Sequence, residues 1–170
     1  MILIHTALLC EAQSFIEFYK LKKINSKTYS NDKIVILISG IGKQNTIKEL
    51  SNVFLYYNIK KAFNIGIAGC NDIQVPIGSI FCTNQKISNF SYLPLITKDE
   101  ITTDSKYKES ILYDMEAKYF EDILSKKLNK DSIFIFKIVS DHLSKERLVK
   151  DFIKKIISSH KNLCHFIQEI

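Results

Sequence analysis

The chain has 170 residues, 46% of them hydrophobic, a length and composition that predict one domain spanning residues 1–170. Its 24 lysine and arginine residues outnumber 18 acidic ones, giving a formal charge of +6, but they form no stripe alternating with aromatic residues. This excludes a nucleic-acid partner of the single-strand-binding kind. No apolar run reaches the roughly 20 residues of a membrane span, and no signal peptide is apparent, so we predict a cytoplasmic protein without membrane contact.

Cysteine and histidine spacing gives no indication of a metal site. The cysteines have neither Cys-x-x-Cys spacing nor a histidine at metal-ligand distance, and they are Cys10, Cys70, Cys82 and Cys164. The histidines form no spaced pair with carboxylates. We therefore predict reduced thiols, no metal and no cofactor.

Apolar runs with strand-like and helical spacing alternate along the chain. In chain order we predict a strand at Ile2–Leu9, a helix at Ala12–Lys20, a strand at Ile34–Ser39, a helix from Gly42 to about Tyr57 with a capping box at Thr46–Glu49, strands at Lys61–Ile65 and Ser79–Gln85, a helix at Met115–Leu128, a strand at Ile133–Ser140 and a helix at Leu148–Ile157. This alternation predicts an α/β fold with three layers, α/β/α, around a mixed, largely parallel central sheet.

Glycine is confined to one part of the chain. All five glycines lie between residues 40 and 78, and four of them belong to the strings Ser39–Lys43 and Asn64–Gly69. Each string closes a strand-like run. Glycine is tolerated best where the chain turns sharply or approaches another group. Two such strings at strand ends predict one small-molecule crevice at the edge of the sheet.

Three carboxylates stand at the boundaries of predicted elements. Glu11 follows the first strand, Glu116 lies four residues before Phe120 on one predicted helix, and Asp141 ends the last long strand. Each position also has a purely structural interpretation. Glu11 and Glu116 are typical of acids in the first turn of a helix, and Asp141 is typical of a cap on the following turn. Both interpretations are open on position alone.

Six short motifs, taken in order, resemble the superfamily of purine nucleoside phosphorylases and methylthioadenosine/S-adenosylhomocysteine nucleosidases. The motifs are Ala7–Glu11, Ser39–Lys43, Asn64–Gly69, Ile77–Ile80, Asp114–Ala117 and Ile138–Asp141. Each is weak alone, but together they cover most of the chain from residue 7 to residue 141. The stretch 79–113 is shorter than in typical relatives, so the chain resembles a shortened member.

The resemblance implies cleavage of the N-glycosidic bond of a purine nucleoside such as methylthioadenosine or S-adenosylhomocysteine. In the nucleosidase branch, the acid matching Glu11 activates water, the one matching Glu116 binds the ribose hydroxyls, and the one matching Asp141 protonates the leaving base. The other residues expected to contact substrate are Met115, Gly40, Gly66, Ala68, Gly69 and Ser140. Relatives assemble as dimers or hexamers, so we expect a homo-oligomer, with a dimer favoured and Tyr56 and Tyr57 as candidate contacts.

Water is the expected nucleophile. The phosphorylases of the superfamily hold phosphate with glycine amides and arginines, whereas the segment Leu8–Ala12 has no glycine and carries an acid. The one arginine, Arg147, lies outside those positions. His5 and Lys43 are candidates to meet an anion, although His5 is better interpreted as a packed strand residue. A nucleoside phosphorylase is therefore the alternative enzyme.

Two departures from the family pattern keep a non-catalytic nucleoside-binding or scaffold protein open. Ile67 stands where many relatives have serine, and the shortened stretch 79–113 is where the base pocket is expected. Within it, Thr102–Tyr107 could offer polar and aromatic contacts to a base, with a surface loop as the simpler interpretation. An NAD-binding fingerprint is excluded because Asn45 replaces its third glycine, and a P-loop because Leu37 replaces its first.

Overall fold

The computed structural model describes residues 1–146 and 148–170. Its strands are β1 (Ile2–Thr6), β2 (Lys22–Lys23), β3 (Thr28–Ser30), β4 (Ile34–Ile38), β5 (Lys61–Cys70), β6 (Ile80–Cys82), β7 (Ser91–Tyr92), β8 (Leu95–Thr97), β9 (Leu112–Asp114) and β10 (Ile133–Asp141). Its helices are α1 (Leu9–Phe18), α2 (Lys43–Tyr56), α3 (Ala117–Leu124), α4 (Lys150–Ser158) and α5 (Lys161–Glu169), with a short 3-10 helix at Lys130–Ser132.

The strands form one mixed sheet. Their order is β2-β3-β4-β1-β5-β10-β6-β7, and the pair β8-β9 joins at the end of β5. The central strands β4, β1, β5 and β10 are parallel, while β3, β6 and β9 pair antiparallel with β4, β10 and β5 respectively. Continuous apolar runs, such as Ile34–Ile38, form the centre because parallel strands are covered on both faces.

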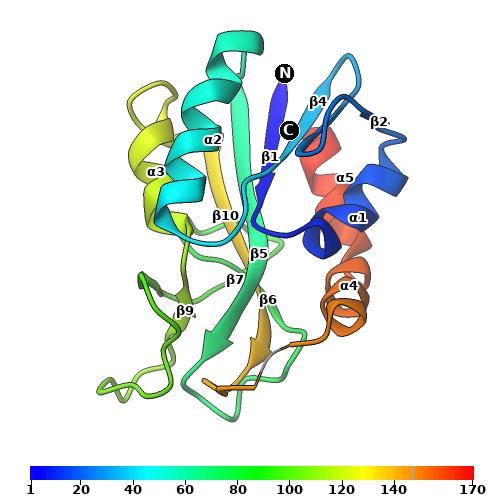
Figure 1. The fold of residues 1–170 in the computed structure, drawn as a ribbon. Coiled ribbons are helices and arrows are strands. Elements are labelled where there is room, and N and C mark those ends of the chain that lie inside the picture. Colours follow the sequence, from blue (N-terminus) through cyan, green and yellow to red (C-terminus); the bar gives the residue numbers. More distant parts are fainter. Residues whose placement is uncertain (147) are drawn as a thin grey trace.

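Two layers of helices cover the sheet (Figure 1). On one face, α2 and α3 pack Leu50 and Phe120 against Leu3 and Val35. On the other face lie α1, α4 and α5, whose apolar side chains share a second cluster with the central strands. The three-layer α/β/α fold and the mixed, largely parallel sheet predicted from the sequence are therefore confirmed.

Several predicted boundaries were wrong. Helix α2 has the predicted bounds, but the predicted capping box is wrong: the N-cap is Gly42, whose φ of +88° favours glycine, and Thr46 is a buried residue inside the helix. Helix α1 begins at Leu9, three residues early, because the Glu11 carboxylate accepts the Leu8 N–H and caps it. Helix α3 begins at Ala117 and ends at Leu124, so it is shorter than predicted.

Other elements had not been predicted at all. Strands β2, β3, β7, β8 and β9 are two or three residues long, too short to show a period of two. Helix α5 was also missed; it packs Leu163 and Ile167 into the core, and Tyr19 of α1 donates a hydrogen bond to the Cys164 carbonyl oxygen at 2.7 Å. In the two described ranges, no helix combines the length and apolar character needed to cross a bilayer.

Strand β5 is longer than predicted and positions the candidate site. It continues five residues beyond the expected end at Ile65, so the glycine string lies inside the strand. Glycine lowers strand propensity, but pairing of Ala68 with Val139 in β10 extends the strand despite this. The neighbouring strand β1 ends at Thr6, and β9 pairs with β5 only from Gly69. On that side β5 therefore has a short free edge.

Candidate active site

The free edge of β5 is where the chemically active side chains meet. It runs from Gly66 to Ala68, between the end of β1 and the start of β9. It lies at the carboxyl end of the parallel strands, where open α/β sheets bind ligands. On this edge, the backbone N–H of Ile67 donates a hydrogen bond to a side chain, that of Glu11, with a distance of 3.1 Å to Oε1.

Glu11 is buried and held by backbone donors on both carboxylate oxygens. Its Oε2 accepts the N–H groups of Ala7 (3.0 Å) and Leu8 (2.8 Å), and its Oε1 accepts that of Ile67. A methyl group added at Gly66 would lie 2.9 Å from Oε1, so this carboxylate occupies its position only because residue 66 has no side chain. Burial raises the pKa of Glu11, although the surrounding N–H groups and Lys137 oppose this.

Lys137 is a functional candidate that the sequence analysis missed. It lies on β10 opposite Gly66, fully buried, with its Nζ 2.7 Å from Asp114 Oδ2. The same methyl group at Gly66 would lie 3.5 Å from this Nζ, so Lys137 and Glu11 border one point. Burial alone would lower the pKa of Lys137, but Asp114, Glu116 and Glu11 together raise it. The signal in the sequence was a lone lysine inside the apolar run 133–140.

Glu116 approaches the same place from the other layer. It is the residue before α3, and its Oε1 accepts the N–H of Gly42 at 2.7 Å. This hydrogen bond joins the motifs Ser39–Lys43 and Asp114–Ala117, since Gly42 and Glu116 lie 74 residues apart in the sequence. Burial raises the pKa of Glu116 to about 7; Lys137 and the Gly42 N–H lower it, and Asp114 and Glu11 raise it. Glu116 and Glu11 are thus near enough to affect each other's charge.

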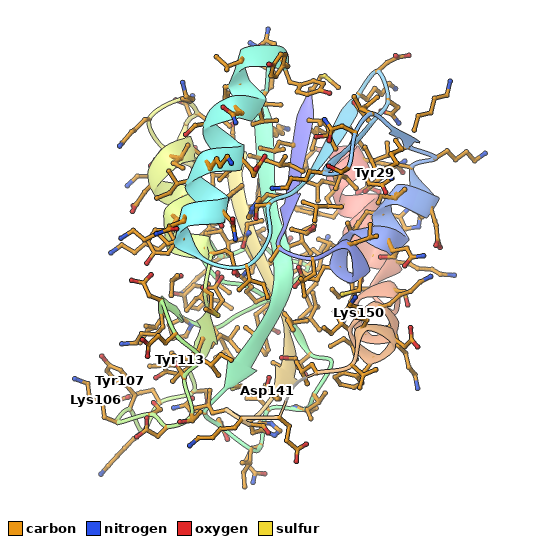
Figure 2. The ribbon with its side chains drawn as sticks, in the orientation of Figure 1. Tyr29, Lys106, Tyr107, Tyr113, Asp141 and Lys150 are labelled. Carbon is orange, nitrogen blue, oxygen red and sulfur yellow. The ribbon has the colours of Figure 1, made fainter. Side chains whose placement is uncertain are left out.

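Asp141 is the last residue of β10, where Figure 2 labels it, and it faces β5 beyond Gly66. A register shift between Val139 and Asp141 places it opposite Gly69, and a methyl group there would lie 3.2 Å from Oδ1. Its Oδ2 accepts the Ser140 hydroxyl at 2.7 Å, and its Oδ1 accepts the Ser144 N–H at 3.0 Å. Unlike Glu11, Asp141 is only partly buried.

Two of the three acids therefore lie along β5. Glu11 lies at Gly66 with Lys137, and Asp141 lies at Gly69, about 10 Å further at 3.3 Å per strand residue. Glu116 lies on the N–H of Gly42, near enough for Lys137 and Glu11 to shift its pKa. The first end offers fixed charges, and the second offers a carboxyl group that is open in part to solvent. This arrangement can perform acid and base chemistry on a ligand that lies between the two ends.

The remaining predicted site residues lie beside these groups. Gly40, at a φ of +91°, donates its N–H to the Ala7 carbonyl oxygen at 3.0 Å and so holds the loop before α2 against the end of β1. Ala68 is buried on β5, and its carbonyl oxygen lies 3.2 Å from Ser140 Oγ. Met115 directly precedes Glu116 and is half-buried.

His5 has no free ring nitrogen, so the expectation that it could meet an anion is wrong. Its Nε2 lies 2.9 Å from Ser39 Oγ, its Nδ1 lies 2.7 Å from Asn64 Nδ2, and its ring stacks on Phe120. Burial, with a contribution from Lys137, lowers its pKa to about 3. His5 is a neutral, packed strand residue beneath the site.

The other two basic residues considered for an anion site are Lys43 and Arg147. Lys43 is exposed, with its Nζ 5.3 Å from the ring centroid of Tyr119. Arg147 lies outside the described residues. Among the described residues, no group of three histidine, cysteine, aspartate or glutamate side chains is placed to hold a metal ion.

The stretch 102–107 is tied to the end of β5. The Asn71 side chain donates to the carbonyl oxygens of Tyr107 (3.1 Å) and Glu109 (2.9 Å), and Ser105 Oγ lies 2.7 Å from the hydroxyl of Tyr113. Figure 2 shows Lys106 and Tyr107 at the outer side of this loop. The loop is therefore anchored beside the end of β5, with the exposed Tyr107 at its surface.

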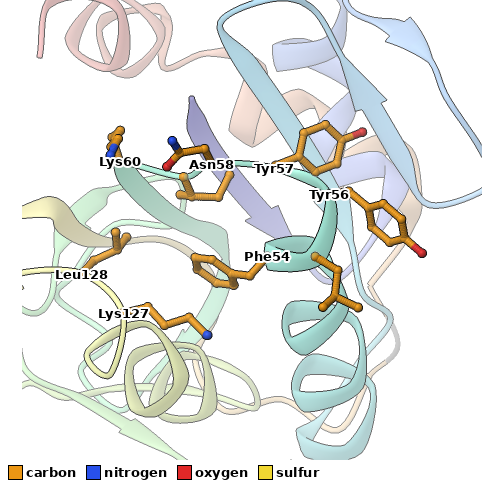
Figure 3. Close-up of a pocket in the computed structure, with 9 residues that line it drawn as sticks. Phe54, Tyr56, Tyr57, Asn58, Lys60, Lys127 and Leu128 are labelled. Atoms are coloured by element: carbon orange, nitrogen blue, oxygen red, sulfur yellow. The ribbon is translucent and has the colours of Figure 1, made fainter.

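Figure 3 shows a hollow of about 610 Å³ at the opposite end of the sheet. It is lined by the end of α2, by residues 58–60 at the start of β5, and by Lys127 and Leu128. A second hollow of about 440 Å³ shares Tyr56 and Tyr57 with it. None of the three acids lines either hollow, because the acids lie where the parallel strands end and not where they begin.

The structure superposes on solved structures over nearly its whole length. A mutant of the Helicobacter pylori methylthioadenosine nucleosidase, with 5′-methylthioadenosine in its active site, superposes with a TM-score of 0.80 at 12% identity, covering 99% of this chain and 97% of that one. A mutant of Helicobacter pylori futalosine hydrolase gives 0.80 at 13% identity, covering 99% and 98%. A protein from Borrelia burgdorferi B31 assigned as a 5′-methylthioadenosine/S-adenosylhomocysteine nucleosidase, bound to adenine, gives 0.80 at 18% identity, covering 100% of both chains.

Sequence comparisons gave no further relative. No protein-family model matches the chain, and no curated protein matches it either. The likeness to solved structures is thus a likeness of fold. The chain has the fold of methylthioadenosine/S-adenosylhomocysteine nucleosidases and futalosine hydrolase, which confirms at the level of fold the resemblance expected from its six motifs.

Proposed function

We propose that this protein is a nucleosidase that hydrolyses the N-glycosidic bond of a purine nucleoside. The observation that carries the proposal is the buried Glu11 carboxylate, held by three backbone N–H groups beside Lys137 in space that Gly66 leaves empty. Methylthioadenosine and S-adenosylhomocysteine are the first candidate substrates. The support for them is that neighbours of the same fold hold 5′-methylthioadenosine or adenine.

In the proposed reaction, water attacks the anomeric carbon of the ribose. Glu11 accepts a proton from this water, the bond between ribose and base breaks, and its electron pair leaves with the base. Asp141 donates a proton to that base, so the products are free base and free ribose derivative. Burial raises the pKa of Glu11, which makes its carboxylate a stronger base than one in water.

Glu116 is proposed to hold the ribose. Its Oε1 is taken by the N–H of Gly42, while its Oε2 has no hydrogen-bond partner among the described residues. An ionised carboxylate oxygen accepts hydroxyl donors well. Negative charge beside the ribose also stabilises the positive charge that builds on the sugar as the base departs.

The hydrogen bonds of Glu11 favour hydrolysis over phosphorolysis. A phosphate at this end of β5 would need backbone donors, but the N–H groups of Ala7, Leu8 and Ile67 already serve a carboxylate. That carboxylate would also repel phosphate. A nucleoside phosphorylase therefore stays the weaker candidate, and a nucleoside-binding protein without turnover is the candidate of another class.

One experiment separates these three functions. The purified protein is incubated with methylthioadenosine, S-adenosylhomocysteine, adenosine and inosine, each with and without phosphate, and free base is measured by chromatography. We expect base release without phosphate. Release only with phosphate would show a phosphorylase, and binding without release would show a nucleoside-binding protein.

We further propose that the protein acts as a cytoplasmic homo-oligomer, with a dimer favoured. Tyr56, at the end of α2, is 79% exposed and Tyr57 is half-buried, which suits candidate contacts. Sedimentation of the wild type and of Tyr56→Ala tests this. We expect a dimer that the substitution weakens; a wild-type monomer at micromolar concentration would refute it.

A further inference from the structure

We propose that Asp114 is a positioning residue, because its one carboxylate holds both the ammonium group of Lys137 and the turn that presents Glu116. This inference rests on the proposed nucleosidase function and concerns the same site. Asp114 is not proposed to contact substrate; it would act through these two neighbours.

The contacts of Asp114 account for all of its carboxylate. Oδ2 lies 2.7 Å from Lys137 Nζ and accepts the N–H groups of Ala117 (2.8 Å) and Glu116 (3.3 Å). Oδ1 accepts the hydroxyl of Thr97 at 2.6 Å. The side chain is completely buried. Asp114 thus joins β8, β9, β10 and the start of α3 at one point.

This arrangement decides which carboxylate Lys137 pairs with. Three acids, Glu11, Asp114 and Glu116, influence its charge. Within the described part of the chain, its ion pair is with Asp114, and it has none within 4.0 Å of Glu11 or Glu116. Asp114 therefore keeps the ammonium group from neutralising the two carboxylates that the proposed reaction uses. Glu11 stays free to accept a proton, and Glu116 to accept ribose hydroxyls.

The charge balance around the pair is simple. The titratable groups that face it are Glu11 from α1, Glu116 and Tyr119 from the start of α3, and His5 from β1, of which His5 and Tyr119 are neutral. If Asp114 lost its charge, Lys137 would be attracted to Glu11 and Glu116 in its place. Glu11 would then be a weaker base, and Glu116 would ionise at lower pH.

The first test is Asp114→Asn, which keeps the shape of the side chain and removes its charge. We expect kcat/KM for base release to fall at least tenfold, with most of the loss in kcat, and the acid limb of its pH profile to move to lower pH. Asp131→Asn, an exposed change at the far end of the sheet, is the matched control and should leave both unchanged. An unaltered kcat/KM and pH profile in Asp114→Asn would overturn the inference.

A second variant guards against misfolding, because a buried lysine without its counter-ion is destabilising. Asp114→Asn combined with Lys137→Met removes both charges. In the double variant no ammonium group is left to pair with Glu11 and Glu116, so we expect the melting temperature to recover and the acid limb of the pH profile to move back toward that of the wild type. An acid limb that stays where it lies in Asp114→Asn, in a double variant with a restored melting temperature, would overturn the inference.

A third measurement does not depend on turnover. The pKa of Glu116 is raised to about 7 in the folded protein from 4.5, so its contribution to stability is present below pH 4.5 and is lost as pH rises through 7. The melting temperature should therefore fall between pH 5 and pH 8 by more in the wild type than in Asp114→Asn. This difference without any base release would refute the proposed function alone. Base release with the same pH dependence in both proteins would refute the role of Asp114 alone.

Discussion

The two ends of the candidate crevice are built differently. At Gly66, the buried Glu11 is held by three backbone N–H groups beside the buried Lys137, and Glu116, also buried, accepts the N–H of Gly42. At Gly69, Asp141 is half-buried and is held by a neighbouring hydroxyl and one N–H. The first end carries buried charged groups, while the second carries a half-buried acid in contact with solvent.

The difference matches the two tasks of the proposed reaction. A general base and a ribose anchor work best when they are fixed before substrate arrives, because no reorganisation is then needed during the reaction. A proton donor must regain its proton after every turnover, which is easier in contact with water. The two ends can be tested separately, and the following changes are taken from the largest expected effect to the smallest.

Asp141→Asn acts on the second end alone. The amide cannot donate a proton as an acid does, so we expect kcat to fall by about 10²- to 10⁴-fold, the usual contribution of general acid catalysis. The amide keeps one oxygen, which can accept either the Ser140 hydroxyl or the Ser144 N–H, so the turn stays partly held and nucleoside affinity should change little. Base release and calorimetric binding measure the two effects. Unchanged turnover would remove Asp141 from the reaction.

Gly66→Ala acts on the first end. The added methyl group would lie 2.9 Å from Glu11 Oε1, so the carboxylate must move. A displacement of this kind commonly costs about 100-fold in rate, and we expect a loss of that order in kcat. Residue 66 does not have a positive φ, so the backbone accommodates alanine. If kcat stayed within threefold while the protein remained folded, the position of Glu11 would not control the rate.

Glu116→Gln separates binding from chemistry at the first end. Loss of a charged hydrogen-bond acceptor should raise KM roughly tenfold and lower kcat less. In the wild type, kcat/KM should fall as pH drops through about 7, because Glu116 gains a proton. The glutamine variant should lack this dependence. Initial rates from pH 5 to pH 9 test it, and an identical profile in both proteins would assign the dependence to another group.

Lys127→Ala changes the hollow at the opposite end of the sheet and should have the smallest effect. Its Nζ lies 5.1 Å from the ring centroid of Phe54, an exposed contact worth about 0.5 kcal/mol. We therefore expect a slightly lower melting temperature and a turnover within twofold of the wild type. A larger loss of turnover would show that the hollow is coupled to the crevice, against the division described above.

The sequence predicted the central layers well because long strands and helices carry clear periodicity. Ile34–Ile38 and Ile133–Asp141 are continuous apolar runs, and both are central strands. Strands of two or three residues, such as β9, were missed because pairing with β5 and β8 defines them, and neither pairing is visible locally. The extension of β5 through Gly66 and Gly69 was missed for the same reason.

The candidate site was predicted in part. Boundary positions identified Glu11, Glu116 and Asp141 as candidates; the structure places Glu11 and Asp141 against Gly66 and Gly69 of β5, and Glu116 on the N–H of Gly42. Lys137 and Asp114 were not singled out, because a lysine within a strand is recognised as a buried ion only when its partner across the sheet is known. Glu116 was expected inside a helix, but it precedes α3.

The ion pair between Lys137 and Asp114 also restricts how these two positions can change during evolution. With both side chains buried, loss of either one alone leaves an isolated charge, which typically costs 3–5 kcal/mol. During evolution the two residues can therefore change together, either by swapping positions or by becoming a neutral pair. A protein that carries only one of the two substitutions would be strongly destabilised. In a future alignment of close relatives, positions 114 and 137 should vary as a pair, even though 22 residues separate them between β9 and β10.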